Sequence, residues 1–332
     1  MERISRIARL AALLLLCAAA AGVGAAPARA WTIQALGAIN DDSSTAEAID
    51  NRGDVAGWSS FFDPSVNGNR THAILWQDGA MLDLGEGVAF DVNERGTVLG
   101  TVAGSNGIAL YKDGAWHSIG LVGVPLALNR FDDVAGWYSY GGNARAFVFR
   151  NGVLVDIGTF GGASSAAVDV DDRGRVVGYA AVAGNANNHA FLWQDGRMKD
   201  LGTLAGGHES RAAAINNHGV VVGEAWDPNG TPIPFIYDGV MRPLFDVAGG
   251  AKAWAINDHG AVVGTMNSVQ SFLWQDGTLT QLESIPAVRS AGWVQLIPTG
   301  INDRGWITGM GRTSQPVPSG HLPWKAFVLK PR

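Results

Sequence analysis

The stretch Ile49-Asp50-Asn51-Arg52-Gly53-Asp54-Val55-Ala56-Gly57 recurs along the chain and decides its fold. Two apolar segments flank a polar turn that ends in glycine, which is a pattern typical of a tight hairpin. Similar stretches begin 36 to 45 residues apart, close to the length of one β-propeller blade. The six further copies are residues 92–100, 128–136, 170–178, 215–223, 256–264 and 301–309.

Each repeat contains four short segments that favour β-strands. After the first motif comes a second one, Ala73-Ile74-Leu75-Trp76-Gln77-Asp78-Gly79, which recurs with variation in the first six repeats. A third motif, such as Asp200-Leu201-Gly202, closes most units. Apolar β-formers between Gly-containing turns, without helical periodicity, predict four-stranded antiparallel blades. In the fourth repeat we expect strands at residues 166–170, 175–179, 189–193 and 197–201.

The two ends of the repeat region complement each other. The seventh repeat stops after its third strand, at residues 326–329, and an unpaired strand-like segment opens the region at residues 31–37. If that segment supplies the missing fourth strand, the ring closes and leaves no unpaired edge. The sequence therefore predicts an all-β, seven-bladed β-propeller of four-stranded antiparallel blades, closed by the N-terminal strand.

The first thirty residues have the composition of a signal peptide. Arg3, Arg6 and Arg9 precede an apolar run at residues 10–21, and Ala28-Arg29-Ala30 is typical of a cleavage site. We expect residues 1–30 to be removed, and residues 31–332 to form a single propeller domain in the periplasm or outside the cell. The single cysteine, Cys17, lies within the signal peptide, so no disulfide is expected. No later apolar run approaches the length of a transmembrane helix.

The charge balance argues against some partners. The net charge of the whole chain is −6, and loss of the signal peptide with its four Arg and one Glu lowers it to about −9. An acidic chain without a run of basic residues is a poor ligand for nucleic acid. A glycan or a protein is the expected partner.

The second and third motifs resemble a known family. His189-Ala190-Phe191-Leu192-Trp193 followed by Asp200-Leu201-Gly202-Thr203-Leu204 is similar to the extracellular HAF repeat, which is named for its His-Ala-Phe triplet. His72-Ala73-Ile74-Leu75-Trp76 is a near copy, whereas repeats at residues 146, 234 and 271 lack the His. The resemblance covers nearly all of residues 31–332. It implies a bacterial, exported repeat protein, and it assigns no reaction or ligand.

Motifs for catalysis, metals or cofactors do not stand out. The seven histidines share no metal-ligand spacing, and no Cys lies beyond the signal peptide, so no metal site is expected. Asp169-Val170-Asp171-Asp172-Arg173-Gly174 resembles a calcium loop, but the bidentate Glu is missing and most other repeats carry Ala or Gly where Asp169 stands. We expect its Asx residues to bond their own turn. No nucleophile motif or phosphate-binding loop is present, so no catalytic residue and no cofactor is predicted.

One face of the predicted ring carries candidate binding residues. Aromatic residues follow the glycine of the second strand in several repeats, at the end where the longer connections 59–70, 180–188, 206–211, 226–231 and 310–321 are expected. Aromatic rings at such a rim can stack on sugars or contact peptides, or simply pack between blades. The candidates are Trp58, Trp137, Tyr179 and Trp226, together with His208 and Arg211.

Three functions remain open. The first is an exported, non-catalytic propeller that binds a glycan or a protein through this face. The second is a carbohydrate-active hydrolase or lyase with carboxylates converging on the central channel. The third is a purely structural surface or matrix protein.

Overall fold

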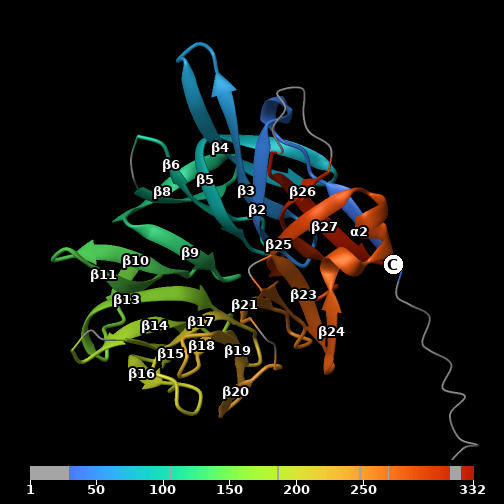
Figure 1. Ribbon diagram of the computed structural model, residues 1–332. Helices are drawn as coiled ribbons and strands as arrows, with labels where there is room; N and C mark the ends of the chain where they lie inside the picture. The colour runs from blue at the N-terminus through green and yellow to red at the C-terminus, as the bar shows by residue number, and fades with distance from the viewer. Residues whose placement is uncertain (1–29, 105–106, 185–186, 247–248, 268, 315–322) are drawn as a thin grey trace, which may run out of the picture.

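A computed structural model describes residues 30–104, 107–184, 187–246, 249–267, 269–314 and 323–332. The predicted signal peptide, apart from Ala30, lies outside these residues. The described chain is built almost entirely from antiparallel strands, and Figure 1 shows their sheets following one another in chain order around the middle of the molecule. No helix within the described ranges is long and apolar enough to cross a membrane.

Four of the sheets consist of four consecutive strands, as the repeat predicts. In the fourth repeat the observed strands include or overlap all four predicted ones. The strands, sheet by sheet, are β9 (Val124–Leu128), β10 (Val134–Tyr140), β11 (Asn143–Arg150) and β12 (Val153–Asp156); β13 (Gly161–Val170), β14 (Val176–Val182), β15 (Asn188–Gln194) and β16 (Arg197–Asp200); β17 (Ser210–Ile215), β18 (Val221–Trp226), β19 (Pro232–Tyr237) and β20 (Met241–Pro243); and β21 (Ala251–Ile256), β22 (Val262–Met266), β23 (Gln270–Gln275) and β24 (Thr278–Gln281).

The first two repeats share one seven-stranded sheet. Its middle strand β5 pairs with β4 through residues 80–86 and with β6 through residues 87–92, so the strand belongs to two four-stranded halves. Gly87, where the pairing changes, has a φ of 154°. The sheet contains β2 (Ser43–Ile49), β3 (Val55–Asp63), β4 (Gly68–Gln77), β5 (Ala80–Val92), β6 (Val98–Val102), β7 (Gly107–Lys112) and β8 (Ala115–Val122).

The N-terminal strand pairs with the C-terminal strand, as expected from the sequence. β1 (Trp31–Ala35) lies antiparallel to β27 (Lys325–Pro331), with Trp31 opposite Pro331 and Ala35 opposite Phe327. β27 continues to β26 (Ile307–Thr313) and β25 (Trp293–Ile301), which completes a four-stranded sheet. The chain ends are thus joined by a ladder of backbone hydrogen bonds.

Two details differ from the sequence-based expectation. The stretch 59–70, expected as a loop, is mostly a continuation of the β3–β4 hairpin, with Asp63 opposite Gly68, and it projects beyond the other sheets in Figure 1. Short helical segments also occur: η1 (Ile39–Asp41), η2 (Leu282–Ser284) and α2 (Pro286–Ser290). Pro286, at the start of α2, favours a helical turn that is too short to produce a periodic pattern.

The apolar core consists of clusters between consecutive repeats. Trp193 packs with residues of the third and fourth repeats, and Trp76 packs with the first repeat and Ala326 of the seventh. These tryptophans and the partly buried Trp274 fill the space between neighbouring sheets. The Phe of the second motif is fully buried in five repeats, at positions 147, 191, 235, 272 and 327.

The glycine that ends the first motif is required by close packing within each sheet. Gly264 lies opposite Phe272 on the neighbouring strand. A Cβ at Gly264 would overlap the carbonyl oxygen of Lys252 and lie 2.7 Å from Cζ of Phe272. The first strand has a β-bulge beside this position, between Ala253 and Ala255, which brings its carbonyl close. Gly178 pairs with Phe191 and Gly223 with Phe235 in the same way.

The His of the His-Ala-Phe triplet pairs with the Asp of the third motif. His189 Nδ1 lies 2.9 Å from Asp200 Oδ2, and this Asp also accepts a hydrogen bond from Gly202 N at 2.7 Å. His72 and Asp83 repeat the contact in the first repeat. The second and third motifs are therefore in contact through this pair. The contact lies at one end of the ladder between the third and fourth strands of the repeat.

A turn joins the first two strands of each repeat, and we call it the hub turn. Each begins with a buried Asn or Asp whose side chain accepts hydrogen bonds from its own turn, as the sequence predicts. Asn257 Oδ1, for example, accepts from the backbone N–H groups of His259 and Ala261. The hub turns are residues 50–53, 93–96, 129–132, 171–174, 216–219, 257–260 and 302–305.

Two buried carboxyl groups connect neighbouring sheets. Asp91 accepts hydrogen bonds from Val92 N at 2.8 Å and from Leu128 N, in the next sheet, at 2.7 Å. Asp169 does the same for Val170 N and Ile215 N. Burial raises the pKa of Asp91 to about 8 and that of Asp169 to about 6. In the stretch that resembles a calcium loop, Asp171 bonds its own turn as expected, whereas Asp169 also bonds the next sheet.

We predict that Gly264→Ala lowers the free energy of unfolding by about 1–3 kcal/mol, because the added methyl has no room. Urea unfolding followed by tryptophan fluorescence measures the change. Gly68→Ala is the control, since its nearest atom is Val66 O at 3.8 Å, and we expect less than about 0.5 kcal/mol there. Equal stability of Gly264→Ala and the unmodified protein would contradict the packing argument.

The raised pKa of Asp91 predicts a pH dependence of stability. The folded protein holds a proton on Asp91 up to about pH 8, whereas the unfolded chain releases it near pH 4. The contribution of Asp91 to the free energy of unfolding therefore falls as the pH rises between these values, by at most about 1.4 kcal/mol per unit. We expect Asp91→Asn to remove this contribution to the pH dependence of the free energy of unfolding between about pH 4 and pH 8.

Urea titrations at pH 4.5 to 8.5 test the slope. Asp169→Asn is the comparison, because a pKa of about 6 confines its effect to lower pH. A slope that is the same in Asp91→Asn and in the unmodified protein would show that the carboxyl group is ionised throughout.

Candidate ligand site at the channel mouth

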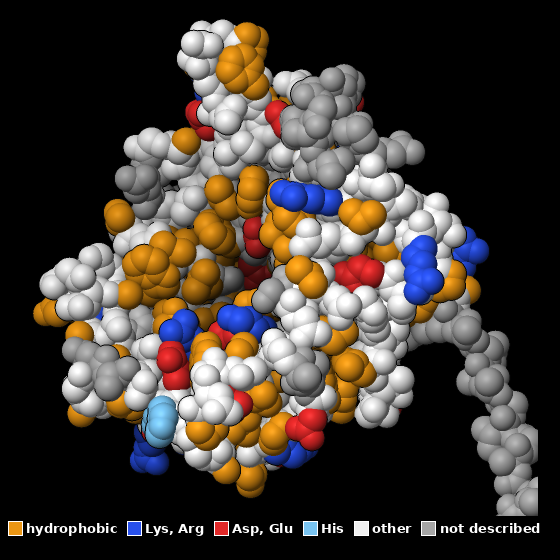
Figure 2. Space-filling model, viewed as in Figure 1, with side chains coloured by type: hydrophobic (Ala, Val, Ile, Leu, Met, Phe, Trp, Pro, Cys, Tyr) orange, Lys and Arg blue, Asp and Glu red, His pale blue; other side chains and the backbone are white. Residues whose placement is uncertain are grey.

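The first strands of the seven repeats surround a central channel. Its wider part is a cavity of about 590 Å³ to which each of these strands contributes one equivalent residue. In Figure 2 the cavity is the hollow in the middle of the face, bordered by hydrophobic side chains on one side and by Lys and Arg on another. The seven residues are Glu47, Phe90, Leu126, Val168, Ala213, Trp254 and Thr299.

One side of the cavity is mainly apolar. Phe90, Leu126 and Val168 line this side in three consecutive repeats. Ile297 and Pro298 of the seventh repeat add to the apolar surface. These positions belong to the inner strands, where an apolar side chain cannot be covered by another sheet. A ligand with an apolar face would remove this surface from water.

The opposite side carries two cations, each paired with a carboxylate. Arg211 on β17 contacts Glu209 through Nε at 3.0 Å and through Nη2 at 2.6 Å. Lys252 on β21 lies 2.8 Å from Oε2 of Glu224, a nearly buried residue on β18. Arg211, Glu224 and Lys252 all line the cavity.

Aromatic rings hold these cations in place. The Arg211 guanidinium lies 5.1 Å from the Tyr179 ring and 5.3 Å from the Trp226 ring. Lys252 Nζ lies 5.9 Å from the same Trp226 ring and 5.7 Å from that of Trp254. Both cations thus share one indole, and each also contacts a ring that lines the cavity.

Glu47 is the carboxyl group on the far side of this cavity. Its Oε1 accepts a hydrogen bond from Trp58 Nε1 at 2.9 Å. Burial raises the pKa of Glu47, and the bond from Trp58 opposes this only in part. The group is therefore easier to protonate than an exposed glutamate.

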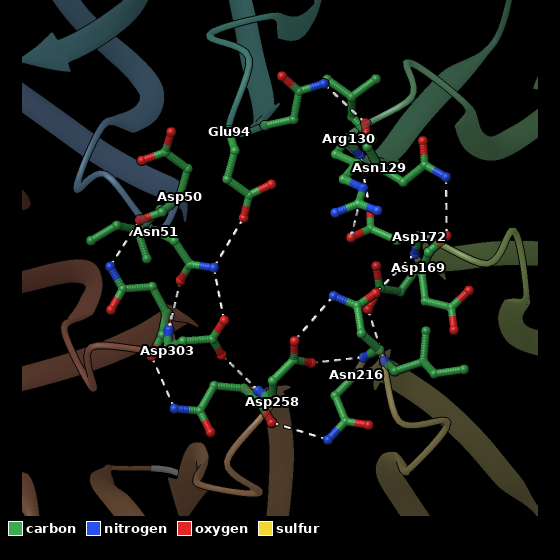
Figure 3. A pocket seen from close by; sticks show the side chains of 18 of the residues that line it. Asp50, Asn51, Glu94, Asn129, Arg130, Asp169, Asp172, Asn216, Asp258 and Asp303 are labelled. Atoms are coloured by element: carbon green, nitrogen blue, oxygen red, sulfur yellow. Dashed lines mark hydrogen bonds and ion pairs between the residues drawn. The ribbon is translucent and has the colours of Figure 1, made fainter.

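The narrow end of the channel is built differently. There the hub turns enclose a polar cavity of about 210 Å³, shown in Figure 3. Asn51 Nδ2 donates to Glu94 at 3.0 Å and to Asp303 at 2.7 Å, and Asn217 Nδ2 donates to Asp258 at 3.1 Å. Among the described residues no group of three or more His, Cys, Asp and Glu is placed to hold a metal ion. The polar groups here serve mainly to bond one turn to the next.

The structure brings three of the six residues singled out from the sequence together, namely Tyr179, Arg211 and Trp226. Trp58 lies in the first repeat, against Glu47. Trp137 is half-buried on β10, and its ring makes none of the aromatic or cation contacts found in the described part of the chain.

His208 does not join this group, because it is exposed in the connection before β17.

Sequence reasoning missed Lys252, Glu224 and Trp254. An alignment of the first strands could have found the first of these, because Lys252 stands two residues before the bulge position, as Arg211 does in the preceding repeat. Glu224 stands at the same position of the fifth repeat as Tyr179 in the fourth, directly after the glycine of the second strand. Trp254 stands at the same position of the sixth repeat as Glu47 in the first. Which of these positions face one cavity depends on how the sheets are arranged around it.

Comparisons with known proteins support the fold. No known family model and no curated protein matches the sequence. Among solved structures, virginiamycin B lyase from Staphylococcus aureus is similar over 90% of this chain and 99% of its own, with a TM-score of 0.54 and 13% identity.

Two further solved structures are less similar. The β-propeller domain of the Trilobed protease from Pyrococcus furiosus has a TM-score of 0.45 at 12% identity, over 74% of this chain and 97% of that one. TolB from Acinetobacter baumannii has a TM-score of 0.46 at 12% identity, over 71% and 62%. At such low identities a similar structure indicates the fold alone. On the similarity to virginiamycin B lyase and on its own sheets, the chain has an all-β fold of antiparallel sheets of the β-propeller kind.

Proposed function

We propose that this chain is an exported, seven-bladed β-propeller that binds a glycan at the wide mouth of its channel. The seven blades are the four-stranded units that follow the sequence repeat, with β5 counted in both the first and the second. Export rests on the signal-like residues 1–30, and a bacterial cell envelope or exterior is the compartment that this implies.

Two sets of contacts support a closed ring. The β1–β27 ladder gives the last unit its fourth strand. Hydrogen bonds also join the seventh hub turn to the first, from Asn302 Nδ2 to Asp50 O at 2.8 Å and from Asp303 N to Asn51 Oδ1 at 2.8 Å. Between the fifth and sixth repeats the corresponding bonds are made by Asn216 and Asn217.

The observation that carries the binding function is the grouping of aromatic and charged side chains around one cavity. Tyr179 and Trp254 line a space of about 590 Å³ together with Arg211, Lys252 and Glu224. Flat rings next to hydrogen-bonding groups are suited to sugars, whose C–H faces stack and whose hydroxyls need polar partners. Since these side chains are fixed by contacts with one another, little ordering would be required on binding.

We predict that Trp254→Ala weakens oligosaccharide binding about tenfold, because Trp254 is 38% exposed and lines the cavity, where its indole can stack on a sugar. Protein purified after export of the full-length chain is titrated with a panel of neutral and acidic oligosaccharides, and tryptophan fluorescence is recorded. Tyr140→Ala, which removes an exposed ring outside the cavity, is the control. Absence of saturable binding throughout the panel would overturn the glycan assignment.

A second candidate is cleavage of a glycan in the same cavity. Glu47 and Glu224 both line it, and their surroundings differ: burial favours the protonated form of Glu47, whereas Glu224 contacts the Lys252 ammonium. Two carboxyl groups in unlike environments can act as acid and base. If so, Glu47→Gln and Glu224→Gln each reduce product formation at least about a hundredfold. Chromatography of the same oligosaccharides after incubation is the measurement, and unchanged chain lengths with the unmodified protein would contradict cleavage.

A further inference from the structure

We infer that the channel mouth recognises a carboxylated sugar, a uronate, through Arg211 and Lys252 acting together. The inference rests on the proposed glycan binding and names the chemical class of the glycan. It starts from two like charges that are held against one aromatic ring at the edge of the same cavity.

The two cations lie near one another because they approach the same ring. Arg211 and Lys252 lie 5.3 and 5.9 Å from the Trp226 ring, on strands of neighbouring sheets. Like charges brought together in a partly desolvated site repel each other. Glu209 and Glu224 offset part of this, but each contacts only one of the two cations. Neither glutamate bridges the two cations, so a ligand carboxylate that contacts both would add an interaction that the protein itself does not make.

Both cations retain hydrogen-bond donors for such a ligand. The contacts of Arg211 with Glu209 use Nε and Nη2, and the guanidinium has a further N–H pair on Nη1. Lys252 has three N–H donors, and Glu224 is its one ion-pair partner among the described residues. Charge-assisted bonds from two donors to the two oxygens of one carboxylate are stronger than bonds to a neutral hydroxyl.

The rest of the cavity fits a sugar ring better than a flexible acidic side chain. Trp254 contributes an exposed indole next to Lys252, and Tyr179 a ring next to Arg211. A pyranose that carries its carboxylate on the ring can stack and form the ion pair at once. Glu47 lies on the far wall, away from Arg211 and Lys252, and burial raises its pKa.

The test compares sugars that differ only in the carboxylate. Trigalacturonate and its methyl ester are titrated into the purified protein by calorimetry at two salt concentrations. We expect the ester to bind at least about tenfold more weakly, and trigalacturonate alone to lose affinity at higher salt. Triglutamate, which supplies carboxylates without a sugar ring, is expected to bind more weakly than trigalacturonate.

Variants then assign the effect to the two cations. Arg211→Met and Lys252→Met should each weaken trigalacturonate binding at least about tenfold and leave ester binding nearly unchanged. Lys252→Arg should largely restore it, which separates loss of charge from misfolding. Arg242→Met is the matched control, because Arg242 is an exposed arginine paired with Asp238 rather than a residue of the cavity.

Each result has a distinct meaning. Equal binding of acid and ester, or full affinity in both Met variants, would overturn the uronate inference while glycan binding stands. Tighter binding of triglutamate would replace the sugar with an acidic peptide. No binding of either trisaccharide, nor of the neutral sugars tested above, would remove the proposed function together with the inference.

Discussion

The buried Asn or Asp at the start of each hub turn is the contact on which the architecture depends. Its side-chain oxygen satisfies the N–H groups of its own turn, and where the residue is Asn, the amide donates to a carbonyl of the next turn, as from Asn257 to Asn302 O at 2.9 Å. One residue thus closes a hairpin and positions the neighbouring sheet. Because a buried donor or acceptor without a partner costs about 1–3 kcal/mol, the position tolerates few residue types.

The two turns that begin with Asp instead of Asn show how this requirement is met without an amide. Asp171 cannot donate, and Arg175, bonded to its carboxylate, supplies the link instead by donating to Asn217 O at 3.1 Å. In the first repeat Asp50 pairs with Arg52, and Asn51 donates to Glu94 in the next turn. The repeats therefore vary in sequence while each keeps a donor directed at its neighbour.

The scaffold and the candidate site use different positions of the same repeat. Gly264 and Phe272 are fixed by packing within a sheet, and positions of this kind are similar in most repeats. The equivalent channel-facing position of the first strand differs from repeat to repeat. This position is Glu47 in the first repeat, Ala213 in the fifth and Trp254 in the sixth. Such variation places charged and aromatic side chains on one side of the cavity although the repeats share one fold.

The sequence by itself determined the repeat, the four strands of each unit, the turns and the pairing of the first strand with the last. The repeat, its strands and its turns are local and recur seven times, so hydrogen bonding and residue pattern specify them. The pairing of the first strand with the last follows from the two ends of the repeat region, since the seventh repeat lacks a fourth strand and residues 31–37 form a strand-like segment without a partner in their own repeat. The link from Asp91 to Leu128 N, the short helix at Pro286 and the grouping of Arg211 with Lys252, Glu224 and Trp254 were decided only by the tertiary structure. The side-chain contacts among these features join neighbouring sheets, and which side chains meet depends on the twist and spacing of those sheets, which no local pattern encodes. The helix at Pro286 is too short to give a periodic pattern.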